Sequence, residues 1–248
     1  MKLASGHRVL HFERIDSTNA EARRLAEAGE RGPLWIVAHE QTGGRGRLGR
    51  SWISEPGNLY GTFLFAIEAD PGIAAQVSFV AALAVHDLVV KLLPGEVPLI
   101  KWPNDVLLRG AKFCGLLAEV VAPSVVALGC GINIAHAPKT TPYPVTALGH
   151  GLTVESILQE LDASLANRLK LWDEGRGFAA IRDAWMARAV GVGGAAAAPL
   201  GGREISGIFK GLADDGALIL ELADGSHKPI HAGEVRFAEI ETLRKRQP

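Results

Sequence analysis

The sequence predicts an α+β protein in which a mixed sheet packed with helices is followed by a smaller, β-rich unit. Apolar segments of strand length are interspersed with longer segments of helical periodicity over residues 1–192. From about residue 199 the apolar period becomes two, which is typical of strands. The chain has 248 residues, 48% of them hydrophobic, which suffices for one large domain and one small one.

Net charge, the N-terminal residues and the cysteine count exclude several classes of protein. The net charge is −1, which argues against nucleic-acid binding as the main role. The N-terminus has no apolar region of a secretory signal. The two cysteines, Cys114 and Cys130, predict neither a disulfide framework nor a zinc site. We therefore expect a cytoplasmic protein that binds neither nucleic acid nor a membrane.

The first predicted elements are a strand at residues 9–12 and a helix that begins within residues 16–21, DSTNAE. Thr18 and Glu21 have the spacing of a capping box, and helical periodicity continues to Gly29. Two interpretations stay open. The segment is a helix cap, which the local pattern favours, or its hydroxyl and amide groups face a ligand at the helix N-terminus.

The middle of the chain predicts the rest of the large domain. Residues 70–93 form a long helix with Pro71 in its first turn, and its polar interruptions favour a buried core helix over a membrane span. Residues 105–108 and 112–121 form a hairpin joined at Arg109-Gly110. Further strands are expected at 34–38, 58–67, 97–101 and 124–128, further helices at 153–172 and 178–190, and an irregular surface loop at 135–147.

A change of composition at residues 191–198, GVGGAAAA, marks the expected boundary between a domain of residues 1–192 and one of residues 199–240. Short strands are expected at 204–211, 217–222 and 228–235, with Asp-Gly pairs between them that favour tight turns. These strands predict a small β-barrel. The last residues, 244–248, are polar and expected to fray.

The most informative stretch is residues 42–52, TGGRGRLGRSW, which holds four glycines and three arginines. Glycine lets the backbone approach a ligand closely, and arginine offers a planar fork of donors to carboxylate or phosphate. The stretch lacks the Gly-Lys-Ser/Thr of a Walker A loop and the strand–helix context of a dinucleotide fingerprint. It predicts a loop that wraps a small anion; a mobile solvated loop is the alternative.

Three further groups could carry chemistry. Residues 101–105, KWPND, place a lysine, an amide and a carboxylate on one turn. Asp105 is a candidate for Mg²⁺, which proteins hold through one or two carboxylates together with nucleotide phosphates. Lys112 begins an otherwise apolar strand and is either an edge residue or a ligand contact. The glycines of residues 129–133, GCGIN, end a strand and form either a simple turn or a pocket wall.

Cys130 lies between two of those glycines and raises the alternative of a thiol nucleophile, although a small core residue is the commoner role for a cysteine in an apolar strand. His39 has no motif partner and is expected to be structural or at the surface.

GRGRLGRSW, KWPNDV, KFCGLLAE and GCGIN, in this order, resemble the biotin–protein ligase family in its form without an N-terminal DNA-binding domain. The resemblance runs from about Val9 to about Phe237. It implies a catalytic domain of the class II synthetase-like, biotin and lipoate ligase type, followed by an SH3-like barrel. It also implies a two-step reaction: biotin and ATP-Mg²⁺ give biotinyl-5′-AMP, and a lysine of a biotin carboxyl carrier protein then takes the biotin.

The resemblance also implies roles for individual residues. Catalysis falls to Arg47, Lys112 and Asp105, with Asp105 also at the metal. Biotin contacts fall to Ser17, Thr18, Asn19, Gln41, Gly44, Arg45, Gly46, Arg47, Trp52, Lys112, Gly115, Gly129 and Gly131. ATP contacts fall to Arg47, Arg50, Asn104, Lys112 and Asn133. The cations would offset the repulsion between a carboxylate and phosphates, on the order of 4 kcal/mol for two charges ~4 Å apart at an effective dielectric near 20.

Three hypotheses follow. The first is an ATP-dependent biotin ligase of a carrier protein of acetyl-CoA carboxylase or a related carboxylase. The second is a lipoate or octanoyl ligase or transferase of the same fold, in which Cys130 could carry the acyl group. The third is a binding module without turnover, against which the three arginines argue. The resemblance also allows a homodimer.

Overall fold

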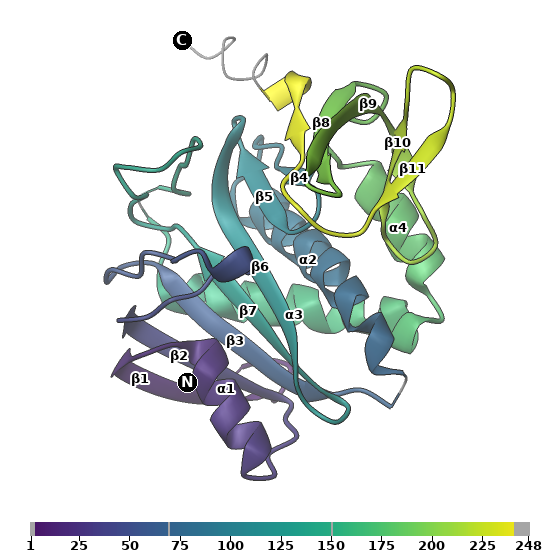
Figure 1. The fold of residues 1–248 in the computed structure, drawn as a ribbon. Coiled ribbons are helices and arrows are strands. Elements are labelled where there is room, and N and C mark those ends of the chain that lie inside the picture. Colours follow the sequence, from purple (N-terminus) through teal and green to yellow (C-terminus); the bar gives the residue numbers. More distant parts are fainter. Residues whose placement is uncertain (1–2, 69, 150, 241–248) are drawn as a thin grey trace.

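The computed structural model describes residues 3–68, 70–149 and 151–240, and it places a seven-stranded mixed sheet beside a smaller five-stranded one (Figure 1). The order in the large sheet is β1-β2-β3-β7-β6-β5-β4. β1 pairs with β2 in parallel and all other neighbours are antiparallel, so the predicted mixed sheet is confirmed. Its strands are β1 (Arg8–Ile15), β2 (Leu34–Gln41), β3 (Leu59–Ala66), β4 (Leu99–Lys101), β5 (Asp105–Leu108), β6 (Ala111–Ala122) and β7 (Val125–Ile132).

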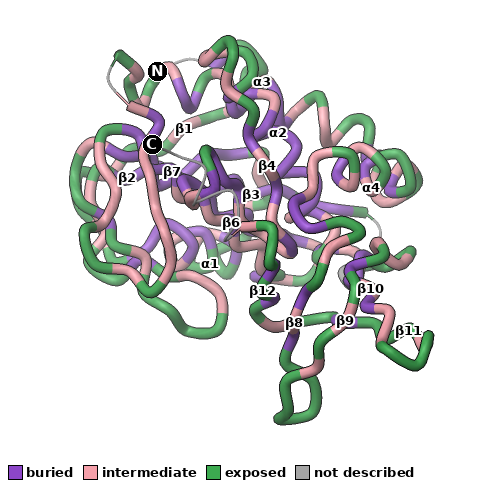
Figure 2. The backbone as a smooth tube through the Cα atoms, turned by 90° about the horizontal axis from the view of Figure 1, so that it is seen from above, coloured by how far each residue is buried: buried purple, intermediate pink, exposed green. Residues whose placement is uncertain are grey.

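Both faces of this sheet are covered by helices, because successive side chains of its strands point to opposite sides. In β2, Leu34 and Ile36 pack with Ala22 of α1 (Thr18–Glu27), whereas Trp35 and Val37 belong to the core on the other face. That second face is covered by α2 (Val77–Leu92) and α3 (Val154–Trp172) (Figure 1). The buried positions gather between these layers (Figure 2).

The long helix expected at residues 70–93 begins as a 3-10 turn, η2 (Pro71–Gln76), and becomes α-helical only in α2. The Asp70 carboxylate accepts from the backbone N–H of Gly72 and caps this turn. The span 72–92 is long and apolar enough to cross a membrane, but most of it is buried inside the protein. The prediction of a buried core helix is therefore confirmed.

The helix start at residues 16–21 differs from the predicted capping box. α1 begins at Thr18 with Ser17 as N-cap, and no side chain caps it. The Thr18 hydroxyl turns instead toward the side chains of Gln41 and Thr62. The Glu21 carboxylate is held by Arg24. The spacing of Thr18 and Glu21 could not tell a helix cap from a ligand-facing segment. The same side chains can cap the helix or, as here, bond other partners and leave the helix start without a side-chain cap.

The predicted hairpin is confirmed, with Arg109 and Gly110 both at positive φ as a two-residue turn requires. β1, β6 and β7 are longer than expected, and β4 is shorter. Residues 135–147 form an irregular segment, as predicted. The remaining helical elements are η1 (Arg47–Gly49), η3 (Asp173–Gly175) and α4 (Phe178–Met186), and α4 ends four residues before the expected Val190.

The C-terminal unit is an open sheet in the order β11-β10-β9-β8-β12, so the prediction of a barrel is wrong in one respect: the described strands do not close. Its strands are β8 (Ala195–Leu200), β9 (Arg203–Leu212), β10 (Leu218–Glu221), β11 (His227–Ile230) and β12 (Arg236–Phe237). The alanines expected at the domain boundary form β8 itself. Trp102 Nε1 donates to Gly216 O at 3.1 Å and ties this sheet to the larger one. The fraying expected at 244–248 lies outside the described residues.

Candidate active site

One cavity collects most of the predicted site residues. It is bounded by the loop after β2, the N-terminus of α1, the glycines of β6 and β7, the β4–β5 turn and residues 233–235 between β11 and β12. The predicted residues that line it are Ser17, Thr18, Asn19, Gln41, Arg45, Gly46, Arg47, Arg50, Trp52, Asn104, Asp105, Lys112, Gly115, Gly129 and Gly131. Sequence-distant segments therefore meet at one site.

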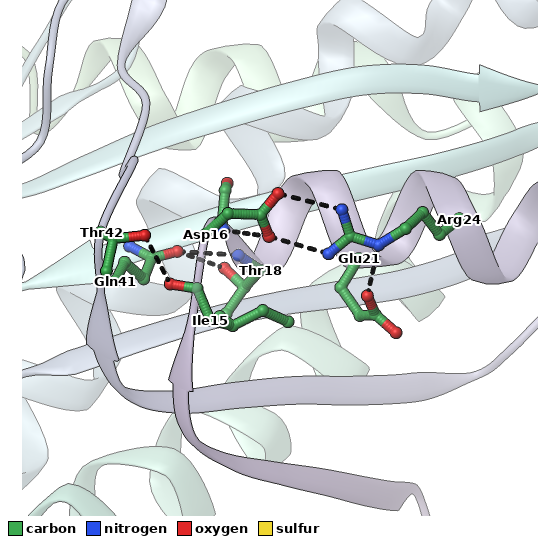
Figure 3. A network of polar contacts seen from close by, with 8 residues as sticks. Ile15, Asp16, Thr18, Glu21, Arg24, Gln41 and Thr42 are labelled. Atoms are coloured by element: carbon green, nitrogen blue, oxygen red, sulfur yellow. Dashed lines mark hydrogen bonds and ion pairs between the residues drawn. The ribbon is translucent and has the colours of Figure 1, made fainter.

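One part of the cavity is polar but uncharged. Gln41, at the end of β2, accepts on Oε1 from the backbone N–H of Thr18 at 2.8 Å and from the Thr18 hydroxyl at 3.1 Å. Figure 3 shows these two side chains facing each other between the ends of β1 and β2. Ser17, Thr18 and Asn19 are all buried. Hydroxyl and amide groups in this setting suit a neutral ligand that both donates and accepts hydrogen bonds.

Just outside, Asp16 and Arg24 form a two-point ion pair, with Arg24 Nη2 2.8 Å and Nη1 3.0 Å from the carboxylate oxygens (Figure 3). The hydrogen bonds from Arg24 hold the pKa of Asp16 at about 2. Residues 42–52 form the arginine loop. Thr42 N donates to Ile15 O at 2.9 Å and Gly43 N to Asp16 O at 2.8 Å, which fastens the start of this loop to the end of β1. This loop is therefore anchored at its first residues.

Three glycines form one wall, two beside the Trp52 indole and one beside the Asn19 amide. A Cβ at Gly131 would lie 2.5 Å from Trp52 Cε2, and one at Gly115 would lie 2.8 Å from Trp52 Cζ3. A Cβ at Gly129 would lie 2.4 Å from Asn19 Oδ1. These distances are too short for real side chains, so glycine is required at each position for the indole and the amide to approach the sheet.

Another part of the cavity is cationic. Lys112 Nζ lies 2.6 Å from Asp105 Oδ1, and Arg47 Nη1 donates to Asn104 Oδ1 at 3.3 Å. Arg50 pairs with Glu234, which arrives from the second sheet. Burial lowers the pKa of Arg47 from its ordinary value, and the charge of Asp105 opposes this shift. The cavity therefore joins a neutral, hydrogen-bonding part to a part that suits anions.

Comparison with known proteins identifies the family. The profile of the biotin/lipoate A/B protein ligase family matches residues 11–134, and the profile of the biotin protein ligase C-terminal domain matches residues 197–237. The chain belongs to the biotin/lipoate A/B protein ligase family.

Similar proteins agree with this assignment. The biotin--[acetyl-CoA-carboxylase] ligase of Paracoccus denitrificans is 44% identical over 238 residues, covering 90% of this chain and 98% of that protein. The enzyme of the same name from Mycobacterium tuberculosis is 32% identical, covering 88% and 85%. The biotin protein ligase of Aquifex aeolicus in complex with biotin and ATP superposes with a TM-score of 0.79 at 26% identity, covering 93% of this chain and 99% of that one.

Two residues that the family resemblance implied do not line the cavity. Gly44 is a buried residue of the arginine loop, where a Cβ would lie 2.5 Å from Trp52 O and 2.6 Å from Ser54 Oγ. Asn133 donates from Nδ2 to Thr146 O at 3.1 Å and is buried. In this structure both residues shape the segments that surround the cavity.

Other cavity residues were missing from the predicted set. Lys101 is half-buried, and burial lowers its pKa although the charges of Asp105 and Glu234 oppose the shift. Tyr143 faces Lys112, with 5.3 Å between its ring centroid and Nζ. Lys101 belongs to the KWPND motif and could have been named from it. Neither Tyr143, in a proline-rich loop, nor Glu234 carries a comparable sequence signal.

Tyr143 is held in place by backbone pairing. Lys112 N donates to Pro144 O, and Thr146 N donates to Lys112 O, each at 2.9 Å. Trp52 lies on Lys112 as well, with 5.3 Å between its ring centroid and Nζ. Two rings and one carboxylate therefore hold this ammonium, which fixes its position before any ligand arrives.

The cysteines do not have the character of nucleophiles. Cys130 lines the cavity but is 2% exposed, and burial raises the pKa of its thiol to about 12. Burial likewise raises the pKa of Cys114. His39 is at the surface, as expected. No group of three or more His, Cys, Asp or Glu side chains within the described ranges could hold a metal ion.

Proposed function

We propose that this chain is an ATP-dependent ligase that activates biotin as biotinyl-5′-AMP and transfers it to a lysine of a biotin carboxyl carrier protein. One observation carries the proposal: a single cavity joins an uncharged hydrogen-bonding part to a cluster of cations. Biotin has a neutral cyclic urea at one end and a carboxylate at the other, and the second substrate is a polyphosphate. The names of the relatives from Paracoccus and Aquifex support the same reaction.

The uncharged part would take the ring system of biotin. Ser17, Thr18 and Gln41 supply hydroxyl and amide groups there. The glycines of β6 and β7 let Trp52 and Asn19 lie close to the sheet, which would leave room in front of them for a flat ring system. Trp52 covers the same wall and would pack against the aliphatic chain. Arg45 and Gly46 lie in the loop that would close over the ligand.

The cationic part would hold the reacting groups. In the first step a carboxylate oxygen of biotin forms a bond to the α-phosphorus of ATP, and the bond from that phosphorus to pyrophosphate breaks. Arg47 and Lys112 would contact the carboxylate and the α-phosphate, where negative charge crowds as the two groups approach. Arg50, Asn104 and Lys101 would contact the nucleotide and its leaving phosphates.

Mg²⁺ is the expected partner of the triphosphate. Asp105 fits such an ion because its carboxylate faces the cavity beside Asn104, and Mg²⁺ in nucleotide sites needs one or two carboxylate ligands. When bound, the ion would neutralise part of the phosphate charge. The Asp105 carboxylate would then be shared between the ion and Lys112.

In the second step the amine of an acceptor lysine attacks the acyl carbon and AMP leaves. We propose that the acceptor is a biotin carboxyl carrier protein in the cytoplasm. No cysteine of the enzyme takes part, in keeping with the raised pKa of Cys130.

The test is pyrophosphate release by the purified full chain with ATP and Mg²⁺, in separate reactions with biotin, lipoate and octanoate. Release that depends on biotin, followed by labelling of a carrier protein, supports the proposal. Release with lipoate or octanoate but not with biotin would assign the chain to the other branch of the family. Binding of biotin without release under any condition would identify a binding module.

A further inference from the structure

A chain of hydrogen bonds runs behind the uncharged part of the cavity and ends on a carboxylate that does not line it. Glu119 of β6 accepts on Oε2 from Asn19 Nδ2 at 2.8 Å. Thr62 of β3, which is fully buried, donates to Asn19 Oδ1 at 2.6 Å. Thr62 Oγ1 also lies 2.8 Å from Thr18 Oγ1. The Thr18 hydroxyl and Gln41 then complete the series at the cavity.

The strand register explains why these groups meet. Gly129 of β7 is the direct partner of Thr62 on one side and of Leu117 on the other. Because Gly129 has no side chain, the Asn19 amide rests on it and reaches both neighbouring strands. The amide also lies 3.4 Å from Leu117 O. Asn19 is therefore held from two sides and has no freedom to rotate without losing a partner.

The direction of the series follows from the chemistry of its ends. An ionised carboxylate can only accept, so the NH₂ group of Asn19 must face Glu119 and its oxygen must face Thr62. The one hydroxyl proton of Thr62 is then used on Asn19, and Thr62 cannot donate to Thr18. At the other end the backbone N–H of Thr18 can only donate, which turns Oε1 of Gln41 toward it.

The consequence reaches the cavity at Thr18. Its own proton points inward, to Thr62 or to Gln41, and its lone pairs stay free for a ligand. We propose that Glu119 is a positioning residue that sets the direction of this hydrogen-bond series and so makes this part of the cavity an acceptor for adjacent N–H groups, as in a cyclic urea. This inference rests on the proposed function, because a cyclic urea is the ring system of biotin.

Glu119→Gln tests the inference with almost no change of shape. Arg23 Nη2 lies 3.8 Å from the other oxygen, Glu119 Oε1. In the variant the guanidinium attracts the amide oxygen, which turns the new NH₂ toward Asn19. Because two NH₂ groups cannot bond each other, the Asn19 amide reverses and gives up its long 3.4 Å contact with Leu117 O. Thr62 then donates to Thr18 and occupies a lone pair that the ligand needs. We expect the Kd for biotin, measured by calorimetry on the full chain, to rise about ten-fold, the value of one hydrogen bond.

Two further variants separate this role from a structural one. Arg23→Ala removes the outer ion pair and keeps the Asn19 contact, so its Kd should stay within about two-fold of wild type. Thr62→Val removes the hydroxyl that transmits the effect, so adding Glu119→Gln to it should change the Kd by less than about two-fold.

The outcomes are distinct. A wild-type chain that binds biotin while Glu119→Gln binds it equally well overturns the inference and leaves the proposed function intact. Losses that multiply in the Glu119→Gln, Thr62→Val double variant also overturn it, because the two residues would then act independently. A folded wild-type chain that does not bind biotin overturns both.

Discussion

Lys112 Nζ lies 2.6 Å from Asp105 Oδ1, and both side chains face the cavity. The carboxylate holds the ammonium in place, and the rings of Trp52 and Tyr143 limit its movement. An incoming carboxylate or phosphate therefore meets a cation whose position is already fixed, which lowers the reorganisation needed during the reaction.

Lys112→Ala should reduce adenylate formation far more than stability. Removing one preorganised group that stabilises developing charge costs about 10²–10³-fold in rate. The free energy of unfolding should change by about 1–2 kcal/mol, an ordinary value for a single substitution. Pyrophosphate release and urea unfolding measure the two effects. Lys91→Ala is the matched control, because its Nζ lies 2.6 Å from Glu160 on the helical side, away from the cavity. Equal losses of stability and activity would contradict the assigned role.

The ion pair of Arg50 with Glu234 joins the arginine loop to the second sheet. Glu234→Ala should loosen the loop and expose Arg45, Arg47 and Arg50 to trypsin in the absence of ligand. Both side chains are partly exposed, so the pair contributes at most about 1 kcal/mol and cleavage should speed up by at most about five-fold. Biotin and ATP should slow the cleavage again.

The control for this measurement is Glu204→Ala, which breaks the exposed pair with Arg236 inside the second sheet. It should leave the rate of loop cleavage unchanged. If both variants are cleaved at the wild-type rate, the contact between the loop and the second sheet does not restrain the loop.

Local sequence patterns were sufficient for the hairpin at Arg109-Gly110 and for the buried helix α2, because turn chemistry and apolar content act over a few residues. They failed at β8, since its alanines have low strand propensity and form a strand only by pairing with β9. Whether the second sheet closes into a barrel also depends on which distant strands pair. The alternating apolar pattern of residues 199–240 predicted strands but not their pairing, so it did not distinguish a closed barrel from an open sheet.

The residues of the site also fall into those that local sequence patterns predict and those that depend on long-range packing. The arginine loop and the KWPND motif are continuous segments, so their chemistry was readable in the sequence. The closeness of Trp52 to Gly131, and of Arg50 to Glu234, depends on how distant segments pack. The cap at Thr18 was predicted wrongly for the same reason: its competing partners, Gln41 and Thr62, lie on neighbouring strands.

Cys130→Ala should retain most of the ligase activity, because a thiol with a pKa of about 12 is protonated at working pH and cannot act as a nucleophile. The loss of the sulfur from a well-packed position should cost about 1 kcal/mol of stability. Rates of biotin transfer and alkylation by iodoacetamide at pH 8 check both points. Loss of transfer in a stably folded variant, or rapid alkylation of Cys130, would restore the thiol mechanism.

The lowered pKa of Lys101 predicts that ATP binding depends on pH. Burial lowers its pKa below the ordinary 10.5, so the folded protein loses this proton at a lower pH than a free lysine does. If Lys101 contacts the phosphates, the protonated form binds ATP, and affinity should fall as pH rises through the lowered value. Lys101→Arg should delay this fall, because a guanidinium stays charged in alkaline solution. The KM for ATP, measured by pyrophosphate release in both proteins from pH 7.5 to 10, checks the prediction. Parallel profiles would show that Lys101 does not neutralise the phosphates.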